Sequence, residues 1–171
     1  MEITTKKLDA YIDVLQPEIN EYIKRMDKSK IVEACEVISE SKRKHGRVHV
    51  TGVGKPSHVA EYIAALNSSV GTPTYYLDTI EAIHGSAGQV LPGDVVIAIS
   101  NSGQTEELKR TVESLKRLEA KIIGVSGGEN SWLKDQSTVF LLAGVNQEGD
   151  DLNKPPRISI IAEIIVLQCL S

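Results

Sequence analysis

The segment that most constrains the fold runs from Val95 to Leu108 and reads VVIAISNSGQTEEL. Its first five residues are apolar and mostly β-branched, as expected for a parallel strand that is buried on both faces. Beyond the polar residues that follow, apolar residues recur at helical spacing, at Leu108, Val112, Leu115 and Leu118. The segment therefore predicts a strand, a polar turn and a helix.

The turn itself indicates a binding site for an anion. A helix that begins near Thr105 points its free N–H groups and the positive end of its dipole into the turn, and short hydroxyl side chains add donors. Open α/β sheets bind ligands at the carboxyl ends of their strands. We therefore expect a phosphate here, the alternative being that Ser and Thr simply cap the helix.

The rest of the chain repeats the alternation of strand and helix. We expect strands over Val48–Val53, Thr74–Leu77, Val95–Ile99, Lys121–Val125 and Thr138–Leu142. Strands that alternate with helices through right-handed crossovers predict an α/β fold with a five-stranded parallel sheet, doubly wound and flavodoxin-like. A last helix, Arg157–Ser171, is apolar nearly all round and must be covered on every side. The sequence has no capping signal at the C-terminal end of this helix, as expected of a chain that is cut short or that continues.

Two extra helices are expected in residues 1–45, ahead of the α/β part in residues 46–171, and no linker divides this single predicted domain. The first helix carries an apolar stripe from Leu8 to Met26, which its own core or a neighbouring subunit has to cover. Pro17 should kink this helix or start a second one. Ser29 is the expected N-cap of the next helix.

Composition excludes several classes of protein. The 171 residues carry a net charge of −4 without a basic patch, which argues against a nucleic-acid partner. No leader opens the chain, and its longest apolar stretch is too short to span a bilayer. Cys35 and Cys169 lie in apolar helical settings and share no metal-like spacing with histidine. We therefore expect a cytoplasmic protein that does not act at a membrane.

A glycine turn follows the first strand, in VTGVGKPSH. Gly52 and Gly54 allow a sharp turn, and Pro56 suits the first turn of a helix. The turn lacks the third glycine of a dinucleotide fingerprint and the spacing of a Walker P-loop. It places Lys55 at the same sheet edge as the polar turn, so we predict that Lys55 contacts a ligand, against the alternative of a solvated lysine.

Five motifs in this order, VTGVGKPSH, GTPTYY, EAIHG, PGDVVIAISNSGQTEEL and KIIGVSG, resemble the sugar isomerase (SIS) domain. Within that family the sequence is most similar to the arabinose-5-phosphate isomerases of the KpsF/GutQ type, here without their CBS domains. The resemblance implies that the polar turn binds a sugar phosphate. The implied binding residues are Gly54 and Ser57 in the glycine turn, and Ser100, Asn101, Ser102, Gly103 and Thr105 in the polar turn.

The resemblance also implies four catalytic residues, Lys55, His84, Glu107 and Glu148. Moving a carbonyl between C1 and C2 of a sugar needs a carboxylate that takes and returns a carbon-bound proton, and a donor or cation that holds the enediol oxygens. In the family this histidine is associated with the site and with metal, but we predict no metal and no cofactor here. Taken alone, Glu107 suits a helix N-terminus, Glu148 a solvated acidic loop and His84 a helix C-terminus.

Several departures from the family pattern support alternatives. Pro56 and Ser57 replace Ser-Gly, Gln104 replaces a glutamate, and Arg157 heads the last helix as a possible anion ligand. A histidine that the family carries beyond that helix has no counterpart. The first hypothesis is an aldose–ketose isomerase of a phosphorylated sugar; the others are a non-catalytic sugar-phosphate sensor and a 6-phospho-3-hexuloisomerase. The family implies a homo-oligomer, a dimer or tetramer, with the apolar terminal helices at the interface.

Overall fold

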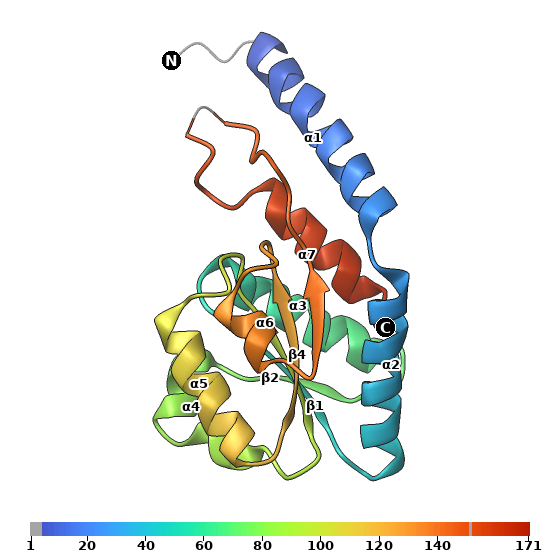
Figure 1. Ribbon diagram of the computed structural model, residues 1–171, viewed down its shortest axis with the longest axis vertical. Helices are drawn as coiled ribbons and strands as arrows, with labels where there is room; N and C mark the ends of the chain where they lie inside the picture. Colours follow the sequence, from blue (N-terminus) through green and yellow to red (C-terminus); the bar gives the residue numbers. More distant parts are fainter. Residues whose placement is uncertain (1–4, 151) are drawn as a thin grey trace.

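A computed structural model describes residues 5–150 and 152–171 (Figure 1). Its centre is a five-stranded sheet in which every pair of neighbouring strands is parallel, in the order β2-β1-β3-β4-β5. The strands are β1 Val48–Gly52, β2 Thr74–Tyr76, β3 Val95–Ile99, β4 Lys121–Ser126 and β5 Val139–Leu142. The α/β fold and all five predicted strands are confirmed, with shifts of at most one residue at their ends.

Helices cover both faces of the sheet (Figure 1). One layer holds α2 Lys28–Arg43, α3 Lys55–Ser69 and α7 Ile158–Gln168, and α1 Thr5–Arg25 lies beside α7 and extends beyond the sheet. The other holds α4 Thr79–Ile83, the 3-10 helix η1 Ser86–Gln89, α5 Glu106–Arg117 and α6 Trp132–Gln136. The chain before β1 forms two helices, as predicted, whereas η1 was not predicted.

The central strand β3 joins the two hydrophobic cores. All five of its residues are buried. Val95, Ile97 and Ile99 pack into the core on the α3 and α7 side, and Val96 and Ala98 pack into the core on the α5 side. Alternate side chains of a strand point to opposite faces, so an unbroken apolar run is what a strand between two helical layers requires.

The first two helices differ in part from expectation. Pro17 lies inside α1, which continues past it to Arg25. Asp27, not Ser29, is the N-cap of α2, since its carboxylate accepts the backbone N–H groups of Ser29 and Lys30. Only part of the apolar stripe on α1 is covered, and Leu8, Ile12 and Ile23 stay exposed.

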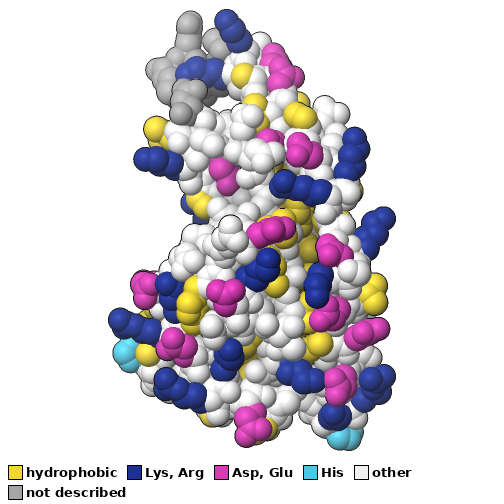
Figure 2. Space-filling model, viewed as in Figure 1, with side chains coloured by type: hydrophobic (Ala, Val, Ile, Leu, Met, Phe, Trp, Pro, Cys, Tyr) yellow, Lys and Arg dark blue, Asp and Glu magenta, His cyan; other side chains and the backbone are white. Residues whose placement is uncertain are grey.

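The surface is mixed in charge on the face drawn in Figure 2, where basic and acidic side chains are interspersed over all elements in view. Within the described residues, no helix combines the length and the apolar character that a membrane crossing needs. Cys35 is half-buried and Cys169 is exposed, so Cys169 is not the core residue that its apolar sequence neighbours predict.

A buried carboxylate fastens the amino ends of β1 and β3. Asp94 accepts the backbone N–H groups of Arg47 at 2.8 Å and Leu91 at 2.9 Å, and its Oδ2 lies 3.2 Å from His49 Nε2. Burial raises the pKa of Asp94, but these hydrogen bonds outweigh burial, so the pKa lies below its ordinary value. Asp94 is therefore a structural anchor on the sheet edge opposite the predicted phosphate turn.

Replacing Asp94 by asparagine should destabilise the fold by about 2 to 4 kcal/mol at neutral pH, because the buried charge is lost and the amide NH2 group replaces one of the two oxygens that accept N–H groups. A lowered pKa contributes stability that disappears as the pH falls through it, so the gap between wild type and variant should shrink in acid. Denaturant unfolding at several pH values measures both effects. Equal stability at neutral pH would show that the anchor is not formed in solution.

Candidate functional site

The polar turn gathers its hydroxyl groups at the carboxyl end of β3. Ser100 Oγ lies 2.9 Å from Thr105 Oγ1 and 3.5 Å from Ser102 Oγ. The backbone N–H of Gly103 donates to Ser100 Oγ at 3.1 Å, and Thr105 is the N-cap residue of α5 without using its side chain as a cap. Three hydroxyls thus meet at the start of α5, where free N–H groups favour an anion.

Two glycines let the turn pack closely against the turn after β4. Gly103 has a φ of +62°, and a β-carbon at this position would collide with Ser131. Gly127 donates its N–H to the carbonyl of Asn101 at 2.8 Å, and a β-carbon there would collide with the Asn101 side chain. Any larger residue at either position would displace the turn, so both glycines fix where its hydroxyls lie.

Further hydroxyls, which were not predicted as site residues, lie beside this turn. Ser126 ends β4, and its Oγ lies 3.1 Å from Ser131 Oγ. On the neighbouring strand β1, Thr51 Oγ1 lies 2.8 Å from Oγ1 of Thr79, the first residue of α4. The position of Ser126 at the carboxyl end of a strand was a usable signal, whereas Ser131 comes to the turn only through the loop before α6.

The glycine turn after β1 forms as expected but leaves its lysine in solvent. Gly54 is the N-cap residue of α3, and Ser57 binds its carbonyl through both the hydroxyl, at 2.7 Å, and the backbone N–H, at 3.0 Å. Lys55 is the first residue of α3 and is exposed. Its ammonium group is therefore free to reach a ligand at this edge.

The structure puts Glu107 and His84 on the surface. Glu107 lies in the first turn of α5 and is exposed, whereas its neighbour Glu106 pairs with Lys109 at 2.8 Å. His84 is the C-cap residue of α4 and is also exposed. Glu107 thus lies at a helix N-terminus and His84 at a helix C-terminus, the positions that suit these residue types. Neither side chain has a hydrogen-bond or ion-pair partner within residues 5–150 and 152–171.

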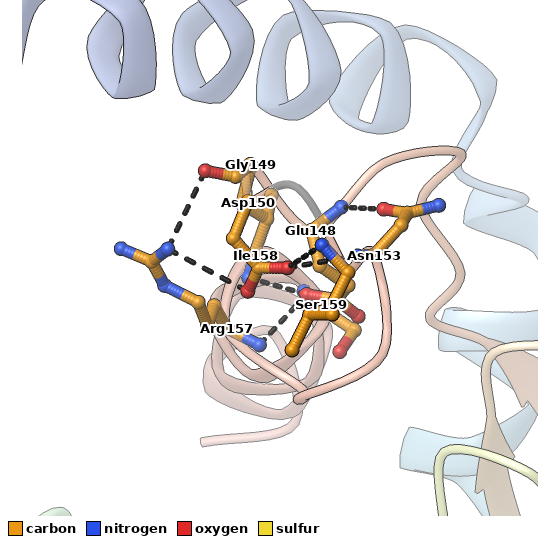
Figure 3. Close-up of polar contacts among 8 residues, drawn as sticks. Glu148, Gly149, Asp150, Asn153, Arg157, Ile158 and Ser159 are labelled. Carbon is orange, nitrogen blue, oxygen red and sulfur yellow. Dashed lines mark hydrogen bonds and ion pairs between the residues drawn. The ribbon is translucent and has the colours of Figure 1, made fainter. Parts of the chain in front are cut away.

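Glu148, by contrast, lies at the N-terminus of α7 (Figure 3). It is only 8% exposed. Its Oε2 accepts the backbone N–H groups of Arg157 at 2.7 Å, Ile158 at 2.7 Å and Ser159 at 3.1 Å. The carboxylate thus satisfies the free N–H groups that begin the helix. The prediction of a solvated acidic loop is wrong for this residue.

The loop that carries Glu148 is held at several points (Figure 3). Glu18 on α1 accepts the N–H of Asn146 at 2.8 Å. The guanidinium of Arg157 lies 4.2 Å from the centre of the Tyr11 ring and 3.7 Å from Asp150. Arg157 is therefore engaged with its own loop and with α1, and its role as an alternative anion ligand stays a prediction.

The predicted catalytic residues are not bonded to one another in the part of the chain that the structure describes. Among the described residues, no hydrogen bond or ion pair links Lys55, His84, Glu107 and Glu148 to one another. A hollow of about 400 Å³ adjoins the polar turn at Gln104 and Ser131. No cluster of His, Cys, Asp and Glu suited to a metal ion occurs in the part of the chain that the structure describes.

Comparison with known proteins gives consistent findings. The model of the SIS domain family matches residues 42–170. The arabinose 5-phosphate isomerase KdsD of Francisella tularensis is 34% identical over the whole chain, which covers 53% of that relative. Its namesake in Pseudomonas aeruginosa is 39% identical over 82% of the chain and 42% of its own length. The chain therefore spans about half the length of these curated relatives.

Solved structures that are similar over nearly the whole chain include one that holds a ligand. It is a protein of Escherichia coli CFT073 in complex with arabinose 5-phosphate, 29% identical, with a TM-score of 0.82. The match covers 98% of this chain and 89% of that one. The same sheet and helical layers thus occur in a protein that holds a sugar phosphate.

Proposed function

Since the chain belongs to the SIS domain family, we propose that it binds a phosphorylated sugar and interconverts its aldose and ketose forms. The observation that carries this proposal is the turn after β3, where the hydroxyls of Ser100, Ser102 and Thr105 meet at the N-terminus of α5. A phosphate dianion there gains charge-assisted hydrogen bonds from hydroxyl and backbone donors. Asn101 and Gly103 in the same turn, and Gly54 and Ser57 at the start of α3, are the other residues of the proposed binding set.

In this proposal, Lys55 and Glu107 act on the sugar. Each is exposed and begins a helix at the carboxyl edge of the sheet. Glu107 is the base that moves a proton between two neighbouring carbons, and the ammonium of Lys55 stabilises the enediol oxygens. Glu148 and His84 are the remaining members of the proposed set. No step of the proposal needs a metal or a cofactor.

We also propose that the site is completed in a cytoplasmic homo-oligomer, a dimer or tetramer. The observation that supports this is the stripe of Leu8, Ile12 and Ile23 on α1, which is exposed. A neighbouring copy that covers this stripe would bury apolar area and bring its own loops toward the site.

A non-catalytic sugar-phosphate sensor is the second candidate. The observation that favours it is Glu148, whose Oε2 already accepts three backbone N–H groups and is therefore poorly placed to take a proton from a substrate. In a sensor the phosphate turn would be used and the proton-transfer residues would not.

Hydrogen exchange in deuterated water separates the two candidates. The protein is incubated with a panel of pentose 5-phosphates and hexose and hexulose 6-phosphates, and the sugars are analysed by NMR. Isomerase chemistry incorporates deuterium at C1 or C2, because the proton taken by the base exchanges with solvent. Binding without incorporation supports the sensor, and absence of binding contradicts both. Inclusion of the hexulose tests the 6-phospho-3-hexuloisomerase alternative.

Replacing Ser102 by alanine is expected to weaken binding of the sugar phosphate by about 1 to 3 kcal/mol, since a charged acceptor loses a donor. Isothermal titration calorimetry measures this loss. Ser114→Ala, on the same helix but away from the turn, is the matched control and should leave affinity unchanged. Equal affinities for both variants and wild type would show that the turn is not part of the binding site.

A further inference from the structure

Helix α7 contains a buried carboxyl group without a hydrogen-bond partner. Glu163 is 0% exposed, and neither of its carboxyl oxygens has a partner among the described residues. Ser159, four residues earlier and therefore on the same side of the helix, also has a buried hydroxyl without a partner. Buried polar groups without partners are rare in native proteins, and each calls for an explanation.

The titratable groups facing Glu163 offer it no compensating positive charge. They are the carboxylate of Glu148, from the loop before α7, and the phenol of Tyr22, from α1. The Tyr22 hydroxyl donates to the carbonyl of Leu142 at 3.1 Å, and Arg25 binds the carbonyl of Gly144. Burial first, and the Glu148 charge second, raise the pKa of Glu163 to about 8.

We propose that Glu163 is a positioning residue that controls, through its own charge, whether Glu148 stays on the N-terminus of α7. While Glu163 is uncharged, the Glu148 carboxylate remains bound to the backbone N–H groups of Arg157, Ile158 and Ser159. When Glu163 ionises, two carboxylates repel one another in a poorly hydrated setting, where such repulsion is strong. The consequence for catalysis rests on the role of Glu148 in the proposed function.

Glu148 is the member of the pair that can move. Glu163 is in the middle of α7, packed against the core on the α3 side, and a shift of its backbone would break the helix. Glu148 belongs to an irregular loop between β5 and α7, where its own N–H donates to Asn153 and the neighbouring Asp150 pairs with Arg157, so no regular helix or strand has to break when its carboxylate leaves the three N–H groups. Repulsion is therefore relieved by release of Glu148 into solvent, which frees the carboxylate for proton transfer and uncaps the helix.

The direction of the pH dependence follows from the raised pKa. Glu163 faces one charge fewer once Glu148 has left, so its pKa is higher while Glu148 is bound than after its release. By linkage, the bound arrangement is favoured at low pH and loses that advantage as the pH rises through the higher pKa. The bound position of Glu148 is therefore favoured below about pH 8 and is lost above it.

Amide hydrogen exchange tests the proposal without requiring activity. Exchange of the N–H groups of Arg157, Ile158 and Ser159 is measured between about pH 6.5 and 9.5 and corrected for the intrinsic rate, with amides of α5 as internal reference. We expect protection of the three amides to fall by about tenfold or more around pH 8, with the reference unchanged. Constant protection in the wild-type protein would overturn the proposal.

Variants assign the effect to Glu163. Glu163→Gln keeps shape and polarity without an ionisable proton, and Glu163→Met provides an apolar alternative should the amide not be tolerated. Both should retain protection across the pH range, and the same fall in either variant would also overturn the proposal. Isomerase assays on these proteins test the proposed function separately. Lack of deuterium incorporation at every pH would contradict that function, while the exchange of the three amides would still decide the role of Glu163.

Discussion

Replacing Glu107 by glutamine is expected to slow deuterium incorporation into the sugar by about 10²- to 10⁴-fold, the usual contribution of a positioned general base. Glutamine has nearly the same shape but cannot accept a proton. Affinity for the sugar phosphate should change little, because the phosphate is held by the turn at Ser100 and Ser102 and Glu107 acts only on the carbons. NMR measures the incorporation and calorimetry the affinity.

The neighbouring residue provides a closely matched control. Glu106 is also exposed in the first turn of α5, so Glu106→Gln removes the same charge from the same end of the helix dipole. The variant also loses one surface ion pair with Lys109, which contributes little to stability. Incorporation that falls equally in both variants would assign the loss to the helix N-terminus and contradict a role of Glu107 as base.

The fold was predictable because its signals are local and agree with one another. The apolar runs at Val95–Ile99 and Lys121–Val125, each followed by a polar turn and a helical period, specify buried parallel strands. Right-handed crossovers then restrict the order of the strands to few possibilities. The N-cap of α2 was misplaced by two residues because Asp27 and Ser29 are both good caps, and the choice depends on backbone angles that residue types do not specify.

The surroundings of the candidate site were less predictable, because they depend on contacts between distant residues. Glu148 belongs to an acidic sequence that is typical of a solvated loop, yet the chain returns and places this one carboxylate on α7. The ring of Tyr11 meets Arg157 across more than a hundred residues, and no local pattern encodes such a contact. For Glu163 the sequence does carry a signal. A single acid in a helix that is otherwise apolar nearly all round must be buried or paired.

Replacing Glu148 by alanine should lower the free energy of unfolding by about 2 to 4 kcal/mol, because three N–H groups at the start of α7 lose a charged acceptor. Glu148→Gln keeps an oxygen that can accept the same hydrogen bonds, so its loss should be roughly half as large. Denaturant unfolding of the three proteins measures the difference. Both variants lack the carboxylate, so if Glu148 takes part in proton transfer they should lose activity equally under conditions where both are folded. A glutamine variant that is as active as wild type would leave Glu148 as a helix cap alone, and equal stability of the alanine variant and wild type would contradict the cap.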